Sequence, residues 1–191
     1  MNKVSVERVE FAPLLDQSPE VIERIRNLRN SVEVSKYMYG DHQISTFEHA
    51  AWIESLRKKP CDRVMVVLYE KRVEGLVSLH AVSQEQKRAE WAFYLSEEIQ
   101  GKGVGGVVEF KLLDLAFEQM GLEKLNCEVL ETNPKVIEMH QKFGFKVEGL
   151  RRANVVKEGE RLGVVLLGML RTEWQEKRPH FSRLFRQDKK Y

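Results

Sequence analysis

The sequence contains few cysteines and no long apolar run, and each absence excludes a class of protein. Its two cysteines, Cys61 and Cys127, lie far apart without the spacing of a metal site. We therefore expect free thiols in a reducing cytoplasm and no bound metal. No apolar run is long enough to cross a membrane, and residues 1–8 contain no apolar core of a signal peptide. These absences predict a cytoplasmic protein without a membrane partner.

A strong net charge is also absent, because 31 Lys and Arg face 29 Asp and Glu, which leaves +2. A dedicated nucleic-acid binder is usually more basic, so we expect no nucleic-acid partner. The length of 191 residues suits one domain with a sizeable core, and no repeat, linker or low-complexity stretch interrupts it. We predict a domain over 1–170 and a basic tail over 171–191. A helix in this tail would dock on the domain through Trp174, Phe181, Leu184 and Phe185.

Apolar periodicity and turn residues predict strands that alternate with helices. Ser18 and Pro19 begin a helix that ends near Asn30, and the capping box of Ser45 and Glu48 begins a second. Strands are expected within 4–11 and at 64–69, 75–82, 89–95, 124–130, 146–152 and 162–170. The glycine-rich segment 101–106 opens a further predicted helix that runs to about residue 120, and another helix is expected at 134–142. The pattern predicts an α/β (α+β) fold with a mixed, largely antiparallel sheet of about seven strands, flanked by helices.

A glycine-rich segment, 100–106, lies between a predicted strand and a predicted helix. Backbone N–H groups at a helix start lack partners and glycines allow close approach, so this segment suits a phosphate or pyrophosphate. A P-loop is excluded, because Gly101-Lys102 is followed by Gly103 and not by Ser or Thr. The dinucleotide motif G-x-G-x-x-G is met by Gly101, Gly103 and Gly106. Its strand belongs to hairpins, however, so NAD binding is the weaker alternative.

The spacing of Gln100, Gly103 and Gly105 resembles the pyrophosphate loop of the GNAT N-acetyltransferases, Gln/Arg-x-x-Gly-x-Gly/Ala. The segment 133–145 resembles that family's second signature, in which an Asn at a strand end precedes a short helix and a Gly-Phe pair. Two motifs in the family's order are far more specific than either alone. The resemblance implies the GNAT fold with helices on both faces of the sheet. It also implies acetyl-CoA as co-substrate and direct acetyl transfer to an amine in a ternary complex.

The resemblance also implies which residues meet acetyl-CoA. In the family, the strand before the loop and the next strand splay apart, and the pantetheine arm pairs with exposed backbone of the first strand. That backbone would here belong to Phe93 and Leu95, the amides of 104–106 would bind the pyrophosphate, and Asn133 would touch the arm. The implied cofactor-binding set is Phe93, Leu95, Gln100, Gly101, Lys102, Gly103, Val104, Gly105, Gly106, Asn133 and Phe143.

The chain departs from the family at the residue that protonates the leaving thiolate. Many members place a Tyr four residues before the Gly of Gly-Phe, and His140 occupies that position here. An imidazolium can act as a general acid near neutral pH, while packing against the sheet explains this histidine equally well. A base must also take a proton from the amine. Glu128, beside the expected acyl site, is the main candidate, with Glu90 and Glu131 as rivals. A backbone N–H of 93–95 would stabilise the oxyanion.

The N-terminal third, within 28–53, resembles bacterial sugar-nucleotide acetyltransferases of pseudaminic acid synthesis, a sugar that often decorates flagellin. These enzymes acetylate the 4-amino group of UDP-4-amino-4,6-dideoxy-N-acetyl-β-L-altrosamine. The resemblance rests on Leu28–Tyr39, His42–Ser45, Glu48-His49 and Trp52-Ile53. A 6-deoxy sugar needs an apolar wall, uracil can stack on an aromatic ring, and cations can meet the diphosphate. The candidate substrate-binding residues are Arg29, Met38, Tyr39, His49, Trp52, His80 and Tyr94. Core packing is the competing explanation, strongest for Trp52.

Two other functions stay open at this point. One is N-terminal acetylation of a protein such as a ribosomal subunit, which needs an open or extended groove instead of an aromatic enclosure. The other is a non-catalytic acyl-CoA-binding sensor, which the missing Tyr suggests. A homodimer is compatible with the sequence, which does not determine the oligomeric state.

Overall fold

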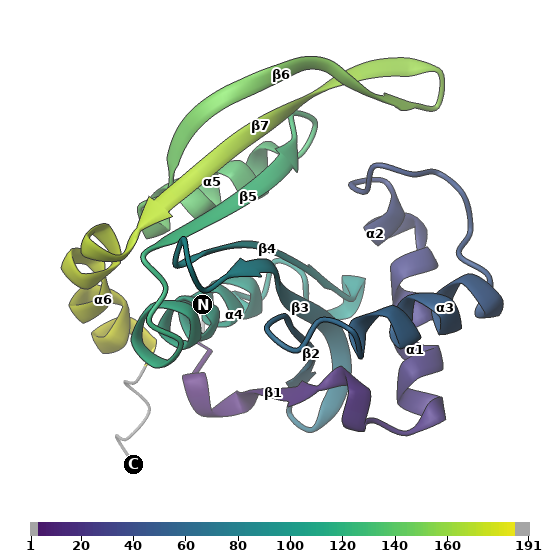
Figure 1. Ribbon diagram of the computed structural model, residues 1–191, viewed down its shortest axis with the longest axis horizontal. Coiled ribbons are helices and arrows are strands. Elements are labelled where there is room, and N and C mark those ends of the chain that lie inside the picture. Colours follow the sequence, from purple (N-terminus) through teal and green to yellow (C-terminus); the bar gives the residue numbers. More distant parts are fainter. Residues whose placement is uncertain (1–3, 186–191) are drawn as a thin grey trace.

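The computed structural model describes residues 4–185 and contains one seven-stranded sheet in the order β1-β2-β3-β4-β5-β7-β6 (Figure 1). The strands are β1 (Val9–Pro13), β2 (Arg63–Tyr69), β3 (Arg72–Ser83), β4 (Arg88–Leu95), β5 (Lys124–Leu130), β6 (Lys146–Lys157) and β7 (Glu160–Leu170). Every neighbouring pair is antiparallel except β4 and β5, which are parallel. The predicted mixed, largely antiparallel sheet is confirmed.

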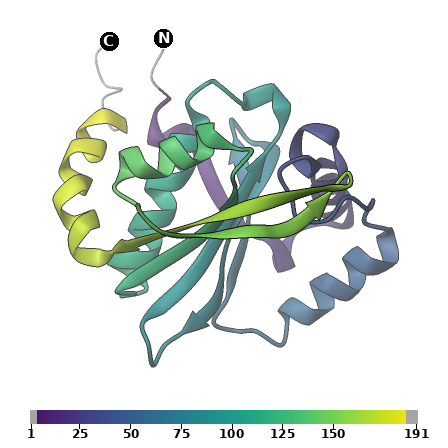
Figure 2. The ribbon, with the colours of Figure 1, turned by 90° about the horizontal axis from the view of Figure 1, so that it is seen from above.

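Helices cover both faces of this sheet (Figure 2). One face carries α1 (Pro19–Asn30), α2 (Val32–Ser35) and α3 (Thr46–Leu56). The other carries α4 (Val104–Leu113) with its π-helical continuation η4 (Asp114–Gln119), α5 (Pro134–Phe143) and α6 (Arg171–Phe185). We call the first of these two sheet faces the α1 face and the second the α4 face. No helix within 4–185 is long and apolar enough to cross a membrane.

Each face of the sheet has its own apolar core, because successive strand side chains point to opposite sides. On β2, Met65 and Val67 join the larger core, which contains most of α4 and part of α6. Val66, between them, joins a smaller core with Ile25 and Leu28 of α1. This alternation assigns the side chains of every central strand to one face or the other.

Local signals explain most element boundaries. The predicted capping box of α3 is present: Ser45 Oγ accepts the Glu48 N–H at 3.2 Å, and the Glu48 carboxylate accepts the Ser45 N–H at 2.8 Å. The first strand differs from the prediction, because it begins only at Val9. The residues before it form a short 3-10 turn, η1 (Val6–Arg8), in which Ser5 Oγ accepts the Glu7 N–H. Two short 3-10 turns, η2 (Leu14–Asp16) and η3 (Glu97–Ile99), follow β1 and β4.

The segment after residue 170 forms α6, which packs on α4 and α5. Trp174 and Phe181 are buried, and the Phe181 ring stacks on Phe143 with 4.1 Å between ring centroids. Asp114 fixes the helix through hydrogen bonds from Trp174 Nε1 at 3.2 Å and Arg178 Nε at 2.7 Å. Residues 186–191 of the predicted tail lie outside the described residues, and the domain boundary at 170 stays a prediction.

Candidate functional site

The parallel pairing of β4 and β5 ends after three residue pairs, at Glu90 and Asn126. From there the two strands separate, so 91–95 and 127–130 do not pair with each other. We call this region the splay. Ala92, in the middle of a central strand, is exposed on the α1 face. A central strand with an exposed small side chain leaves room for a ligand beside it.

The backbone of β4 is oriented into this splay. Ser96 N donates to the Glu74 carbonyl of β3 at 2.7 Å. Bonded and non-bonded pairs alternate in an antiparallel ladder, so the N–H and C=O groups of Phe93 and Leu95 point away from β3. Gln100 Nε2 confirms the direction, because it donates to the Leu95 carbonyl at 3.0 Å. The predicted pantetheine-binding backbone therefore faces the gap between the strands.

The glycine segment after η3 leads directly into α4. Gly101 and Gly103 have φ angles of +72° and +86°, a region that favours glycine, and Gly103 is the N-cap. No side chain caps this helix, so its first N–H groups are free of side-chain partners. A Cβ on Gly103 would approach only Val4, at 3.8 Å, whereas one on Gly106 would lie 3.4 Å from Phe185. Gly101 and Gly103 are therefore needed for their positive φ angles and for an open surface, and not for packing.

The remaining residues predicted to meet acetyl-CoA lie near this segment. Gly105 lies close to Met139 of α5, with 3.5 Å between a built Cβ and its sulfur, and Gly106 rests against the buried ring of Phe143. Lys102 is exposed, and Val104 is buried in the larger core. Asn133 precedes α5 at the end of β5, so the two motifs meet at the two strands of the splay.

His140 lies on the α4 face below the splay and not at the surface. It is 2% exposed, and its ring meets that of Trp91 edge-on with 4.9 Å between centroids. Its Nδ1 is 3.0 Å from Oε1 of Glu109, which is fully buried. The role of His140 as an acid stays a prediction, and the sequence did not indicate its partner.

On the α1 face, three polar residues stand side by side where the splay begins. His80, Glu90 and Asn126 occupy paired positions on β3, β4 and β5, and Asn126 Nδ2 donates to Glu90 Oε1 at 3.2 Å. A β-bulge follows His80, with Ala81 at a φ of +49°, and Asp62 accepts the Val82 N–H at 3.2 Å to hold it. Burial lowers the pKa of His80 below its usual value, which favours a neutral ring.

Glu128, the predicted base, has a partner for each carboxylate oxygen. Arg151 Nη1 of β6 donates to Oε1 at 2.5 Å, and the Tyr39 hydroxyl donates to Oε2. Burial, followed by this bond, raises the pKa of Tyr39 well above its usual value, so the phenol stays protonated. The rival Glu131 accepts the Gly163 N–H on β7. A Cβ on Gly163 would lie 2.8 Å from Glu131, so that carboxylate closes the end of the β5–β7 ladder.

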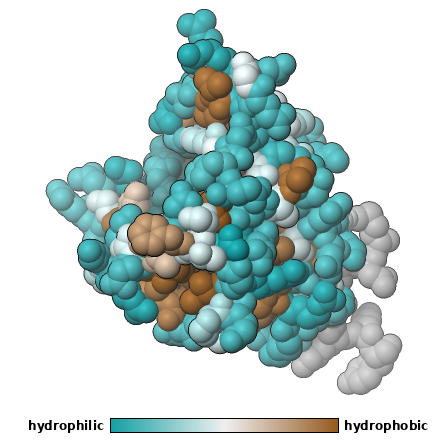
Figure 3. Space-filling view, turned by 90° about the vertical axis from the view of Figure 1, so that its right-hand side faces the viewer, coloured by the Kyte–Doolittle hydropathy of each residue, from teal (hydrophilic) through white to brown (hydrophobic). Residues whose placement is uncertain are grey.

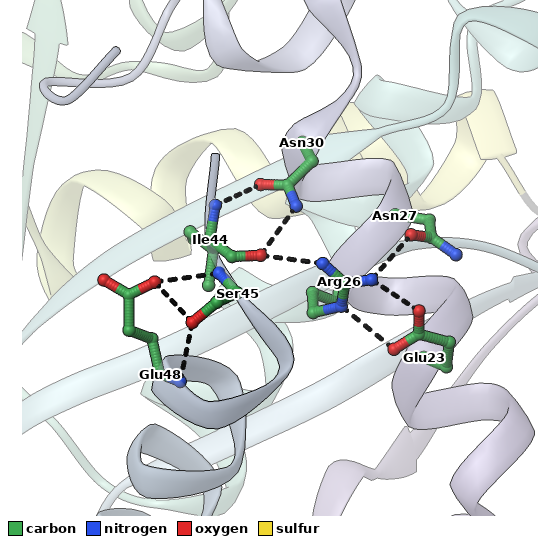
Figure 4. Close-up of polar contacts among 7 residues, drawn as sticks. All are labelled: Glu23, Arg26, Asn27, Asn30, Ile44, Ser45 and Glu48. Carbon is green, nitrogen blue, oxygen red and sulfur yellow. Dashed lines mark hydrogen bonds and ion pairs between the residues drawn. The ribbon is translucent and has the colours of Figure 1, made fainter. Parts of the chain in front are cut away.

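The segment 36–44, between α2 and α3, is attached at both sides of the α1 face. Toward the hairpin of β6 and β7, Asp41 accepts hydrogen bonds from Lys157 Nζ and from the Glu158 N–H. Toward α1, Asn30 exchanges two bonds of 2.9 Å with the backbone of Ile44, as Figure 4 shows. This segment therefore spans from α1 to the hairpin and carries Met38 and Tyr39 with it.

Arg29 and Tyr94 come from α1 and β4. The Tyr94 hydroxyl donates to the Ile25 carbonyl at 3.3 Å, and burial raises its pKa far above the usual value. Arg29 lies near Tyr94. Its Nη1 is buried without a hydrogen-bond partner within the described residues, and burial lowers its pKa. Burying a guanidinium N–H without a hydrogen-bond acceptor costs free energy, and an acceptor on a bound ligand would remove that cost.

The aromatic residues of α3 divide into buried and exposed ones. His49 is 5% exposed and interacts with Arg26 and Glu23 of α1, and burial lowers its pKa. Trp52 tilts against His49 with 5.2 Å between ring centroids and stays 37% exposed. Figure 3 shows the face that carries α1, α3 and the end of the β6–β7 hairpin, with brown apolar patches amid hydrophilic surface. Packing thus accounts for His49, while Trp52 keeps a surface that a ligand can meet.

Sequence reasoning missed three residues of this site, although the sequence around two of them contains a feature that could have indicated their position. Asn126 stands two residues before Glu128, so strand alternation places both on one face. Glu109 is a lone carboxylate in the apolar run 107–113 of α4. No such feature marks Arg151, because the pairing of β6 with β7 and a bulge decide its position.

The family comparison agrees with this geometry. Residues 8–146, more than half of the chain, match the family described as the acetyltransferase (GNAT) domain. The chain belongs to the GNAT acetyltransferases. It is therefore an acetyl-CoA-dependent N-acetyltransferase with the GNAT fold. The residues present fit this co-substrate, because free N–H groups begin α4 beside an open backbone and the β4 edge faces the splay.

Several relatives match over different shares of their length. Spermidine N(1)-acetyltransferase of Escherichia coli is 28% identical over 145 residues, 76% of each chain. Acetyltransferase PseH of Campylobacter jejuni is 26% identical over 137 residues, 72% of this chain and 82% of its own. YdaF of Bacillus subtilis is 28% identical over 109 residues, only 60% of its length and 57% of this chain.

A solved structure supports the fold. Spermidine N-acetyltransferase from Vibrio cholerae, in complex with CoA and spermine, superposes with a TM-score of 0.80 at 23% identity. The match covers 88% of this chain and 99% of that one. At this identity the likeness supports the fold alone, so the amine that accepts the acetyl group is a separate question.

Proposed function

We propose that this N-acetyltransferase acetylates the 4-amino group of a UDP-linked 4-amino-4,6-dideoxy-N-acetylhexosamine of the altrosamine type, in pseudaminic acid synthesis. The observation that carries the proposal is the buried, unpartnered Nη1 of Arg29 on the acceptor side of the splay. A guanidinium in this state needs an anionic or carbonyl acceptor, and the diphosphate and uracil of a nucleotide sugar supply both.

The charges around the acceptor site oppose a polyamine. A polyamine carries several positive charges and is best held by carboxylates that have no cation of their own. Here Glu128 pairs with Arg151, and Asp41 pairs with Lys157. Glu90 has Arg88 as its nearest cation, at 3.8 Å, whereas Arg29 has no carboxylate partner among the described residues, so its positive charge stays unpaired. An anionic acceptor is therefore favoured over a polycation.

The aromatic residues of the same region support a sugar linked to a base. Tyr39 is 44% exposed and Trp52 37% exposed, so each presents part of a ring toward solvent. Such rings can stack on uracil or form the apolar wall that a 6-methyl group needs. Met38, half-buried beside Tyr39, adds a flexible apolar surface.

The reaction needs a base on the acceptor side, and the geometry favours Glu90 over Glu128. Acetyl-CoA supplies the acetyl thioester. Backbone N–H groups of Phe93 and Leu95 face the splay and stabilise the oxyanion that forms there. Glu90 has a neutral amide donor at 3.2 Å, and its nearest cation, Arg88, is 3.8 Å away, so it is free to accept the amine proton. The neighbouring His80, kept neutral by burial, adds no competing charge.

A thiol-release assay with a panel of amines tests the acceptor. We expect kcat/KM for the UDP-linked 4-amino sugar to exceed that for spermidine and for peptide amines by at least about 100-fold. The same sugar without UDP should lose at least about tenfold, because Arg29 then has no anionic partner. Equal or better turnover of spermidine would refute the sugar-nucleotide proposal, and binding of acetyl-CoA without turnover of any amine would favour the sensor.

A second candidate is acetylation of a polyamine, and the relatives are the observation that favours it. The E. coli spermidine N(1)-acetyltransferase matches 76% of this chain, and its identity is slightly above that of PseH. The charge balance described above argues against it.

Comparing the Glu90→Gln and Glu128→Gln variants on the best amine separates the two candidate bases, because only loss of the true base lowers kcat by about 100-fold or more.

A further inference from the structure

Glu109 and His140 form an ionisable pair inside the larger apolar core. Their side chains are 0% and 3% exposed, and Nδ1 of His140 is 3.0 Å from Oε1 of Glu109. The two residues come from α4 and α5, the helices that follow the two strands of the splay. The pair therefore joins these helices directly beneath the point where β4 and β5 separate.

Packing alone does not account for this pair. Oε2 of Glu109 is buried without a hydrogen-bond partner within 4–185, and the same holds for Nε1 of the adjacent Trp91. Burying a carboxylate with one partner is expensive, and apolar residues of similar volume usually stabilise a core as well or better. A pair that costs stability and leaves an oxygen unpartnered fits a functional role better than a structural one.

The ring of His140 is oriented toward the splayed part of β4. It meets Trp91 at 4.9 Å and Phe93 at 6.2 Å between ring centroids, both nearly edge-on. Nδ1 is engaged by Glu109, so Nε2 is the nitrogen left to act on a ligand. The backbone of Phe93 faces the gap in which the thioester is expected. The imidazole thus lies on the side from which a departing sulfur can be protonated.

We propose that Glu109 is a positioning residue that keeps His140 protonated, so that Nε2–H serves as the acid for the departing sulfur. The amine nitrogen forms the new C–N bond with its lone pair, and the C–S bond breaks with its electron pair on sulfur. The Nε2 proton then moves to that sulfur and gives the thiol. The amine proton goes to the base on the α1 face, and solvent restores the proton of His140. This step needs only acetyl transfer and does not depend on the sugar acceptor.

Aromatic rings and one thiol surround the pair. Trp91, Phe93 and Phe145, which surround the ring, do not ionise near neutral pH. Cys127 of β5 is the other ionisable side chain of this cluster. Burial, with the nearby Glu109 carboxylate, raises the pKa of this thiol well above its usual value. The pair therefore supplies the other ionisable side chains of this cluster.

The first test follows the ring by ¹⁵N NMR in the protein without ligand, and so needs no turnover. The sequence has five histidines, and the His140→Gln variant identifies the signal. We expect both ring nitrogens of His140 to carry protons at pH 7.5 in the native chain, and one to lose its proton in Glu109→Gln. A neutral ring in the native chain would overturn the proposal, whatever the amine acceptor proves to be.

Kinetics give the second test, with the best amine from the panel. We expect Glu109→Gln and His140→Gln each to lower kcat about 100-fold while KM for acetyl-CoA changes less than about threefold. Asp114→Asn, on the same helical run, removes a carboxylate that only holds α6 and should leave kcat unchanged. If Glu109→Gln does not fold, the His140→Tyr variant is measured in its place. Its phenol can act as an acid without Glu109, so we expect this variant to retain kcat. A Glu109→Met/His140→Phe variant that keeps full kcat would show a structural pair and end the proposal.

Discussion

The two sides of the splay are built from different parts of the polypeptide. On the acetyl-CoA side, the groups that face the ligand are backbone amides and carbonyls of β4 and of the turn before α4. On the acceptor side they are side chains from β3, β4, β5, β6, α1 and the segment 36–44. The first side needs only strand geometry and glycine, whereas the second needs six segments to be placed correctly at once.

This difference separates a general function from a specific one. Backbone groups bind the same co-substrate whatever side chains surround them, so the acetyl-CoA side can stay constant while the acceptor changes. The acceptor side is held by pairs such as Glu128 with Arg151 and Asp41 with Lys157, each of which a substitution can remove. Mutations on the two sides should therefore affect KM for different substrates.

The largest effect is expected when a side chain is added on the acetyl-CoA side, where backbone groups face the ligand. Gly103→Ala places a Cβ at the N-cap of α4, where φ is +86°, and should weaken acetyl-CoA binding roughly 10- to 100-fold, measured by calorimetry. Gly159→Ala is the matched control, because its φ of +83° in the β6–β7 turn costs the backbone a similar amount. Equal loss of binding in both variants would mean that folding, and not the ligand, requires Gly103.

The next effect should appear on the acceptor side alone. Arg29→Met removes the guanidinium and its buried Nη1, and should lower kcat/KM for a UDP-linked amino sugar roughly 10- to 100-fold, because a charge-assisted hydrogen bond is lost. KM for acetyl-CoA should stay within about twofold, as steady-state kinetics would reveal. An equal loss for the amino sugar without UDP would place Arg29 against the sugar and not against the diphosphate.

A smaller effect is expected at the segment 36–44. Tyr39→Phe removes the hydrogen bond to Glu128 but keeps the ring, so we expect KM for the acceptor to rise about two- to fivefold with kcat retained. Tyr39→Ala also removes the apolar wall and should raise it further. A fall in kcat with Tyr39→Phe, at unchanged KM, would instead place the phenol in the chemical step.

The smallest effect concerns pH. Burial lowers the pKa of His80 and His49 below 6.5, so the unfolded chain binds protons more readily than the folded one. The free energy of unfolding should therefore decrease as pH falls below 6.5, and level off once the folded pKa values are passed. Urea titrations from pH 8 to 5 measure this slope, and a His80→Gln/His49→Gln variant should flatten it. An unchanged slope would assign the pH dependence to carboxylates.

Much of the fold could be predicted because its signals are local. The capping box at Ser45, the proline start of α1 and the period-two pattern of β5 each depend on neighbours within a few residues. The glycine spacing before α4 is equally local, which is why the acetyl-CoA loop was predictable. Glu109 and Arg151 escaped prediction, since their partners His140 and Glu128 are 31 and 23 residues away in the chain.

By itself, the sequence determined the order of strands and helices, the glycine turn before α4 and the membership of the acetyltransferase family, because backbone propensity and short spacing depend on adjacent residues. Tertiary structure alone decided that β4 and β5 separate after Glu90, that both oxygens of Glu128 are bound, and that His140 is buried against Glu109. These outcomes depend on strand register and on the packing of α4 against α5, which no short stretch of residues fixes.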